Sequence, residues 1–161
     1  MKNTETLEVS TPGEREITMT RVFDADRSQV FEAYTNPDLV RRWLLGPAGW
    51  TMPVCEIDFK VGGVFRYVWS APNKPDLGMR GVYREIARPE RIVHTELFDG
   101  DWTGGETLVT TTFSEQGCKT TITTTVRYPS REVRDTVLKS GMDQGVAESY
   151  ERLAHMLPGR P

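Results

Sequence analysis

Near its C-terminus the sequence reads SREVRDTVLKSGMDQGVAESYERLAHMLPG over residues 130–159. Ser130 is suited to cap the start of a helix, and the Pro-Gly pair at 158–159 is suited to end it. Between them, apolar residues recur at helical spacing, at Val133, Val137, Leu138, Met142, Val146, Tyr150, Leu153 and Leu157. The pattern predicts one continuous helix of about 28 residues, roughly 40 Å long at 1.5 Å per residue, which is enough to cross a whole sheet.

The chain before this helix has the pattern of antiparallel strands. Alternating apolar residues, and runs rich in β-branched and aromatic ones, predict one strand within 15–25 and six more between Met52 and Tyr128. The six are expected at 52–60, 64–70, 79–87, 91–98, 107–114 and 119–128. Because the links between them are shorter than a parallel crossover requires, we expect antiparallel neighbours.

Two short helices are predicted between the first strand and the other six. Asp26 or Ser28 can cap one around 30–34, and the Asn-Pro-Asp turn at 36–38 restarts the chain into another over 39–44. The order is then strand, two short helices, six strands and one long helix. It predicts an α+β fold in which a curved antiparallel sheet wraps around the C-terminal helix.

Length and charge limit the domain count and the classes of partner. A chain of 161 residues fits one domain, expected over 15–158, and we expect the polar segment 1–14 to be a disordered or frayed tail without the apolar core of a signal peptide. A net charge of −3 provides no excess of cations for nucleic acid. No apolar run approaches the ~18 residues that span a membrane. We therefore expect a cytoplasmic protein that binds neither nucleic acid nor a membrane.

Few residues are available for metal or redox chemistry. Two cysteines and two histidines are too few for a structural zinc site or a disulfide scaffold. Cys55 and Cys118 lie in strand-like runs, where a buried thiol is typical. The Gly-Gly pair at 62–63 lacks the residues of a phosphate loop, and a nucleophile elbow is missing. We expect neither a metal nor another cofactor.

Several short motifs, taken in their order and spacing, carry a resemblance to a known superfamily. They are Arg42-Trp43 with Gly46-Pro47, DFKVGG at 58–63, GVYREI at 81–86, PERIV at 89–93, and SGM at 140–142 with Gly145. Over roughly residues 15 to 157 the chain resembles the START-like (SRPBCC) superfamily, and within it the branch related to the activator of the heat-shock-protein-90 ATPase. The resemblance implies a helix-grip fold with a deep apolar cavity between the sheet and the long helix.

Strand alternation predicts which side chains point into such a cavity. In the strands at 64–70 and 79–87 the arginines suit solvent, so the sets that alternate with them point inward. In the strand at 91–98 the pattern leaves both faces open, and the resemblance implies that the set with His94 points inward. The predicted inward residues are Phe65, Tyr67, Trp69, Met79, Tyr83, Ile92, His94, Glu96 and Phe98.

His94 and Glu96 are the candidates for polar chemistry in this cavity. On one strand face they would lie about 6–7 Å apart at ~3.3 Å per residue. An ionised carboxylate among apolar side chains is costly unless it is paired. The pair is therefore either a polar handle for ligand binding or proton transfer, or a structural pair in which Glu96 bonds a neighbour or reaches solvent at the cavity mouth.

The C-terminal helix would supply the opposite wall. Gly141, Gly145 and Ser149 lie four residues apart and form a ridge of small residues, flanked by Met142 and Val146. Such a ridge either creates room for a ligand or permits close packing of the helix on a strand.

Tryptophans near loops are candidates for the cavity mouth. Trp43, Trp50 and Trp102 can contact a ligand or gate its access, and they can equally plug the end of a small core. Three glycines surround Trp102 in the loop 99–105, a composition typical of a mobile lid.

Threonine is the commonest residue, with nineteen copies, of which ten lie between Thr103 and Thr125. Most of this cluster is expected on the outer face of a hairpin, where β-branched residues suit a pleated surface. Only Thr111 and Thr124 fall in the apolar register, where they can present hydroxyls to a cavity.

The sequence thus predicts a protein that binds a small apolar or aromatic molecule in an internal cavity. One alternative is an enzyme of cyclase, hydrolase or isomerase type that uses His94 and Glu96 with Tyr67 or Tyr83 as acid–base groups. Another is a co-chaperone-like interaction module, implied by the resemblance alone. The sequence leaves open the identity of the ligand and whether the chain forms a homodimer.

Overall fold

The computed structural model of the chain describes residues 6–100 and 104–157. Within this part the chain forms strands and helices in the order β1 (Glu8–Ser10), β2 (Glu16–Phe23), α1 (Arg27–Thr35), α2 (Pro37–Trp43), β3 (Thr51–Ile57), β4 (Val64–Ser70), β5 (Leu77–Ala87), β6 (Arg91–Phe98), β7 (Thr107–Gln116), β8 (Lys119–Arg127), α3 (Arg131–Lys139) and α4 (Met142–Met156).

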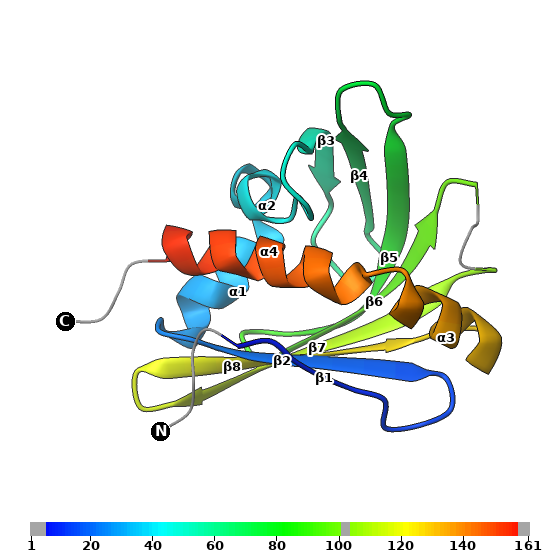
Figure 1. Cartoon of the computed structure of the whole chain (residues 1–161). Helices are drawn as coiled ribbons and strands as arrows, with labels where there is room; N and C mark the ends of the chain where they lie inside the picture. Colours follow the sequence, from blue (N-terminus) through cyan, green and yellow to red (C-terminus); the bar gives the residue numbers. More distant parts are fainter. Residues whose placement is uncertain (1–5, 101–103, 158–161) are drawn as a thin grey trace.

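The strands form one antiparallel sheet that curves around the helices. Its order is β1-β2-β8-β7-β6-β5-β4-β3, so the chain links neighbouring strands except where β2 pairs with β8. In Figure 1 strands β1, β2, β7 and β8 form a floor, β3, β4 and β5 rise from it, and α4 crosses the hollow between them. The predicted α+β helix-grip architecture is confirmed.

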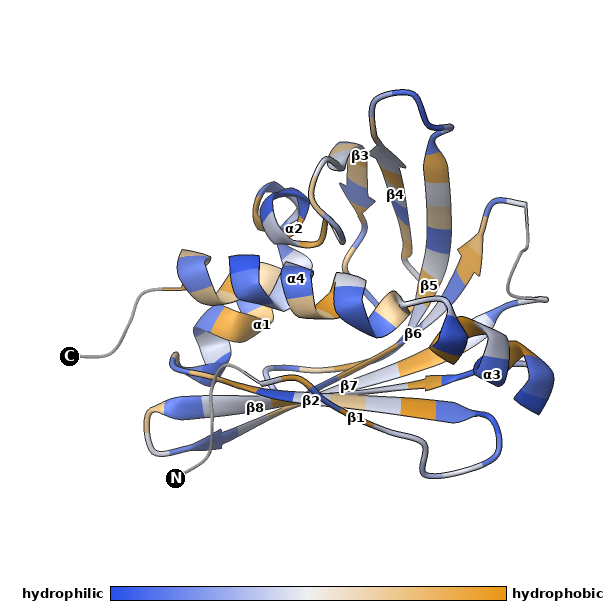
Figure 2. Cartoon of the chain, in the orientation of Figure 1, coloured by the Kyte–Doolittle hydropathy of each residue, from blue (hydrophilic) through white to orange (hydrophobic). Residues whose placement is uncertain are grey.

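Burial alternates along the strands as the sequence pattern predicts. In β5 the buried side chains of Met79 and Tyr83 alternate with the exposed Arg80 and Arg84, and Figure 2 shows hydrophobic and hydrophilic bands along the same strand. Because successive side chains of a strand point to opposite faces, β5 presents one apolar face to the hollow and one charged face to solvent.

The C-terminal helical segment is divided into two helices, so the prediction of one continuous helix is wrong. Gly141 stands between α3 and α4 with φ of 84°, in the left-handed region that glycine adopts without steric cost. The Ser140 hydroxyl donates to the carbonyl oxygen of Val137 and closes the end of α3. Apolar spacing continues through the break because both helices face the same sheet, so periodicity alone did not reveal it.

The N-terminal segment differs from the prediction as well. Residues 8–10, expected within a frayed tail, form β1, and Glu8 pairs with Thr20 at the edge of the sheet. A strand this short shows no alternation that a sequence pattern could detect. The strand extends the sheet by pairing beside β2.

The end of the core beneath α1 and α2 is filled with aromatic rings. Trp43 is 1% exposed, and its Nε1 donates a 2.9 Å hydrogen bond to the carbonyl oxygen of Ala33. Phe31 and Phe113 meet edge to face with ring centroids 5.1 Å apart. Trp43 therefore belongs both to this packed end and, as described below, to the wall of a cavity.

Candidate ligand-binding cavity

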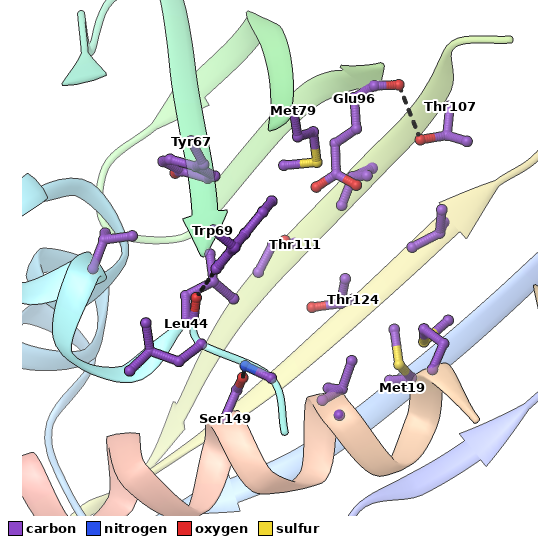
Figure 3. A pocket seen from close by; sticks show the side chains of 18 of the residues that line it. Met19, Leu44, Tyr67, Trp69, Met79, Glu96, Thr107, Thr111, Thr124 and Ser149 are labelled. Carbon is purple, nitrogen blue, oxygen red and sulfur yellow. Dashed lines mark hydrogen bonds between the residues drawn. The ribbon is translucent and has the colours of Figure 1, made fainter. Parts of the chain in front are cut away.

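A cavity of about 490 Å³ lies between the concave face of the sheet and the α2–α4 side of the molecule. Its wall is mostly apolar and aromatic, and Figure 3 shows side chains from the strands and from α4 converging on it. Of the residues predicted to bind a ligand, those on the wall are Trp43, Phe65, Tyr67, Trp69, Met79, Tyr83, His94, Glu96, Phe98, Thr111, Thr124, Met142 and Val146. Trp102 lies outside the described residues. The role of these side chains in binding stays a prediction.

The aromatic side of the wall comes from β4, as alternation predicts. Phe65 and Tyr67 are buried and their ring centroids lie 4.9 Å apart. Trp69 continues this row, and its ring packs 6.5 Å from that of Phe98 on β6. Aromatic side chains two residues apart on one strand thus provide a continuous surface against which a flat or apolar molecule can pack.

Gly81, on the same face of β5, is covered by one of these rings. A Cβ at this position would meet the Phe65 ring and the carbonyl oxygen of Thr95. The missing side chain therefore allows Phe65 to lie directly on the backbone of β5, and it explains why a strand interior tolerates glycine here.

His94 and Glu96 are hydrogen-bonded to each other on the cavity wall. His94 Nε2 lies 3.1 Å from Glu96 Oε2, and because a carboxylate only accepts, Nε2 carries the proton and donates. His94 Nδ1 is buried with no hydrogen-bond partner among the described residues. The face that the resemblance implied for β6 is confirmed, because Ile92, His94, Glu96 and Phe98 all line the cavity.

Glu96 is the one acid among the described residues on this wall, which includes no lysine, arginine or aspartate. Its charge also affects neighbouring phenols. Burial raises the pKa of Tyr128, and the charge of Glu96 adds to the rise. Burial likewise raises the pKa of Tyr67 well above its ordinary value of 10.0. Glu96 is therefore the carboxylate that a ligand would meet on the described part of this wall.

A cluster of hydroxyls forms a second polar spot on the wall. Tyr34 donates a 2.8 Å hydrogen bond to the Tyr150 hydroxyl, which lies 3.4 Å from the Thr124 hydroxyl. Burial raises the pKa of both tyrosines, so they stay protonated and act as hydrogen-bonding groups. Thr124 was predicted here. Tyr34 and Tyr150 were missed, although Tyr150 follows Val146 by one helical turn.

The small residues of α4 hold a loop against the helix. The Ser149 hydroxyl accepts a 2.8 Å hydrogen bond from the Gly46 backbone N–H, and Arg152 Nη1 donates to the Gly46 carbonyl oxygen at 2.7 Å. A Cβ on Gly145 would lie 3.5 Å from Pro47 Cδ, an ordinary contact. Gly145 and Ser149 thus permit close packing against residues 46–47, whereas Gly141 lies in the helix break.

Other wall residues were not found from the sequence. Leu44 and Leu45 follow α2 in a stretch without periodic pattern, whereas Thr107 shares the register of Val109 and Thr111 on β7, a signal that the sequence does contain. Trp50, by contrast, was a candidate for the cavity mouth from the sequence, and it lies on the wall with Lys74 Nζ 5.7 Å from its ring centroid. Loop residues such as Leu44 and Leu45 are placed by tertiary contacts that a linear pattern does not contain.

The two cysteines differ in their burial. Cys55 is buried, as predicted, and burial raises the pKa of its thiol. Cys118 is exposed, so the prediction of a buried thiol is wrong at this position. It forms, with Gly117, the two-residue turn between β7 and β8, where Gln116 pairs with Lys119.

Within residues 6–100 and 104–157, no three histidine, cysteine, aspartate or glutamate side chains come together as metal ligands would. In the same part of the chain, every helix is too short or too polar to cross a bilayer.

The chain is similar in sequence and in structure to known proteins. Residues 24–158 match the family described as Activator of Hsp90 ATPase homolog 1-like protein. A solved structure of a protein from Rhodobacter sphaeroides is 32% identical, with a TM-score of 0.88, and the match covers 94% of this chain and 97% of that chain. Among curated proteins, none matches the chain.

More distant structures share the fold. Protein Ms6760 from Mycobacterium smegmatis is 19% identical with a TM-score of 0.82, covering 97% of this chain and 99% of that one. An AHSA1-like protein from Aeromonas hydrophila is 16% identical with a TM-score of 0.71, covering 88% and 93%. The family pattern extends over most of the sequence, from the end of β2 to the end of α4. This chain therefore belongs to the family of activator of Hsp90 ATPase homolog 1-like proteins, within the START-like (SRPBCC) superfamily.

Proposed function

We propose that this protein binds a small hydrophobic or aromatic molecule in the cavity between the sheet and α4. The observation that carries the proposal is the cavity itself, about 490 Å³ in volume and lined mainly by apolar and aromatic side chains. Small-molecule sites are typically apolar concavities of about 300–1,000 Å³ with a few placed polar groups. Each Å² of apolar ligand surface buried there contributes about 25 cal/mol to binding.

The polar groups on the wall support the same proposal. A binding site of this kind needs a few hydrogen-bonding groups to orient its ligand, and the His94–Glu96 pair and the Tyr34–Tyr150 pair supply them. Membership of the START-like superfamily adds support, because this fold commonly binds hydrophobic ligands.

The proposal is tested with N-phenyl-1-naphthylamine, an uncharged aromatic probe whose fluorescence rises in apolar surroundings. We expect saturable fluorescence enhancement and a rise in the melting temperature, because a ligand that binds only the folded state stabilises it by RT ln(1 + [L]/Kd). A probe concentration of 100 times Kd would add about 2.7 kcal/mol. The absence of both signals, with this probe and with a panel of similar hydrophobic molecules, would contradict the proposal.

An enzyme of cyclase, hydrolase or isomerase type is the second candidate, supported by one observation, the hydrogen bond between His94 and Glu96 on the cavity wall. Tyr67 and Tyr83 would serve such chemistry as protonated, hydrogen-bond-donating groups, because burial raises the pKa of both. A first test is hydrolysis of 2-naphthyl acetate. Release of 2-naphthol faster with the native protein than with His94→Gln would favour the enzyme over a binding protein.

A co-chaperone-like role is the third candidate, and it rests on the name of the family alone. The cavity offers no argument for it, since an internal pocket is not a docking surface for a second protein. This role therefore has the least support of the three.

A further inference from the structure

We propose that the cavity selects an apolar molecule that carries a protonated amine, with the ammonium group paired to Glu96 and the apolar body against the aromatic wall. This inference rests on the proposed binding function and specifies the class of ligand. It follows from the charge, the free acceptor capacity and the position of Glu96.

The charge of the wall favours a cation. Glu96 is the one acidic residue among the described residues that line the cavity, and none of those residues is a lysine or an arginine. The nearby arginines of β4 and β5 lie on the opposite face of the sheet, where Arg66 binds Asp99 at 2.7 Å and Arg80 approaches the same carboxylate at 3.8 Å. An anionic ligand would meet an uncompensated carboxylate at reduced dielectric, whereas a cation would be attracted to it.

The carboxylate retains acceptor capacity for a ligand. Its Oε2 accepts the Nε2–H of His94, and a carboxylate has about four lone-pair sites on its two oxygens. In the described part of the chain, His94 is the only residue that hydrogen-bonds this side chain. Figure 3 shows the Glu96 side chain extending from β6 into the cavity beside Met79. An N–H donor in the cavity can therefore reach the carboxylate.

The position of Glu96 limits the cost of bringing in a charge. Its side chain is 25% exposed, and that of His94 is 16% exposed, so the pair lies where the cavity meets solvent. An ammonium group there keeps part of its hydration, which lowers the desolvation penalty that a buried ion pair incurs. The deeper hydroxyls of Tyr34 and Tyr150 bond each other and offer no charge.

Aromatic rings line the same cavity as Glu96. Phe98 lies two residues beyond Glu96 on one face of β6, and its ring packs 6.5 Å from that of Trp69. Cations are attracted to the faces of tryptophan and phenylalanine rings within about 6 Å of the centroid. A neutral alcohol would gain only the hydrogen bond to Glu96. A carboxylate would gain neither this hydrogen bond nor the attraction of a cation to the aromatic rings.

The test is competition against bound N-phenyl-1-naphthylamine at pH 7.5 with three molecules that share one ring system: 2-naphthylmethylamine, 2-naphthylmethanol and 2-naphthoate. We expect the amine to displace the probe up to about fivefold more tightly than the alcohol, as a partly exposed charge pair allows, and the carboxylate to be the weakest. Glu96→Gln keeps the size and an acceptor for His94 and removes the charge, so the ratio of amine to alcohol affinity should fall to near one.

Glu106→Gln is the matched control. Glu106 is exposed, it immediately precedes β7, and it is absent from the cavity wall. Removing its carboxylate changes the net charge by the same amount as Glu96→Gln does. The native ranking of the three competitors should nevertheless persist in Glu106→Gln. If the ranking collapses equally in both variants, the selectivity comes from overall charge and the inference is overturned.

The outcomes separate this inference from the function on which it rests. If N-phenyl-1-naphthylamine does not bind, the proposed function fails and the inference fails with it. If the probe binds but the amine and the alcohol compete equally, or the carboxylate competes best, the cavity binds ligands without selecting a cation. If the amine advantage persists in Glu96→Gln, Glu96 is not its source. Each of the last two results overturns the inference and leaves the binding function standing.

Discussion

Trp69 Nε1, on β4, donates a 2.7 Å hydrogen bond to the carbonyl oxygen of Leu44, just beyond the end of α2. The loop that begins there is also bound to α4, through Ser149 and Arg152 at Gly46. One loop thus joins three sides of the cavity: the rising strand β4, the short helix α2 and the C-terminal helix α4. These hydrogen bonds fix the position of a loop on the cavity wall, which favours a preformed site.

Trp69→Phe removes this hydrogen bond and keeps an aromatic ring on the wall. We expect the free energy of unfolding to fall by about 1 kcal/mol or more, because the Leu44 carbonyl loses its donor, and the affinity for N-phenyl-1-naphthylamine to weaken. Urea unfolding and fluorescence titration measure the two effects. Trp50→Phe is the control, since it shortens another indole on the wall. Equal losses in both variants would show that the bond to Leu44 has no special role.

Gly81→Ala tests the close approach of Phe65 to the backbone of β5. The added Cβ would meet both the Phe65 ring and the Thr95 carbonyl oxygen, and overpacking of a closed core typically costs about 1–3 kcal/mol. We expect at least this loss in urea unfolding, together with a change in near-ultraviolet circular dichroism from the displaced ring. A stability equal to that of the native protein would mean that the strand shifts freely, contrary to the packing described.

Gly145→Ala is expected to stabilise the protein, in contrast to Gly81→Ala. The new Cβ would lie 3.5 Å from Pro47 Cδ, an ordinary contact, and alanine is favoured over glycine in a helix interior by about 1 kcal/mol. We predict a higher melting temperature by thermal denaturation. Destabilisation would show that the 46–47 loop packs too closely on α4 to accept the added Cβ.

The stability of the protein should fall at alkaline pH because of its tyrosines. The sequence has 5 tyrosines, and burial raises the pKa of each above its ordinary value of 10.0 in the folded state. The stabilisation is complete below pH 10, and it is lost above that as the unfolded chain releases protons that the folded chain retains. Absorbance at 295 nm should therefore rise together with unfolding. Phenolate formation in a protein that remains folded would contradict this prediction.

The chain is not expected to stimulate the ATPase of Hsp90, despite the name of its family. In the described part of the chain, the exposed large hydrophobic residues come from β1, the β3–β4 turn, β4, β7 and α3, and they do not suggest a single apolar docking face. An ATPase assay with purified chaperone and a pull-down measure the effect. Stimulation that survives filling of the cavity would instead favour an interaction module.

Much of the fold and the cavity could be predicted from the sequence, because both depend on alternation. Phe65, Tyr67 and Met79 alternate with arginines that require solvent, and this settles the inward face of β4 and β5. For β6 the sequence pattern did not show which face points inward, because apolar residues occur on both faces: Ile92 and Val93 are both buried. The family resemblance implied the face that points into the cavity in the structure.

The features that the sequence did not reveal depend on contacts between distant segments. The break at Gly141 was hidden because α3 and α4 keep the same apolar spacing. The hydrogen bond between Gly46 and Ser149 joins residues 103 positions apart, and Tyr34 and Tyr150 are 116 apart. No local pattern contains such pairs, so the loop that closes the cavity and its deeper hydroxyl cluster appear only in three dimensions.

The most direct test of the binding site is a titration of N-phenyl-1-naphthylamine into three proteins: native, Val146→Trp and Leu138→Trp. Val146 lies on the cavity wall in α4, so tryptophan there would fill part of the space, whereas Leu138 is 36% exposed on α3 and receives the same bulk outside it. We predict saturable binding to the native and Leu138→Trp proteins, and at least about tenfold weaker binding to a folded Val146→Trp protein, as the loss of ~1.4 kcal/mol requires. Equal binding to all three folded proteins would contradict the account, because the probe would then bind elsewhere than in this cavity.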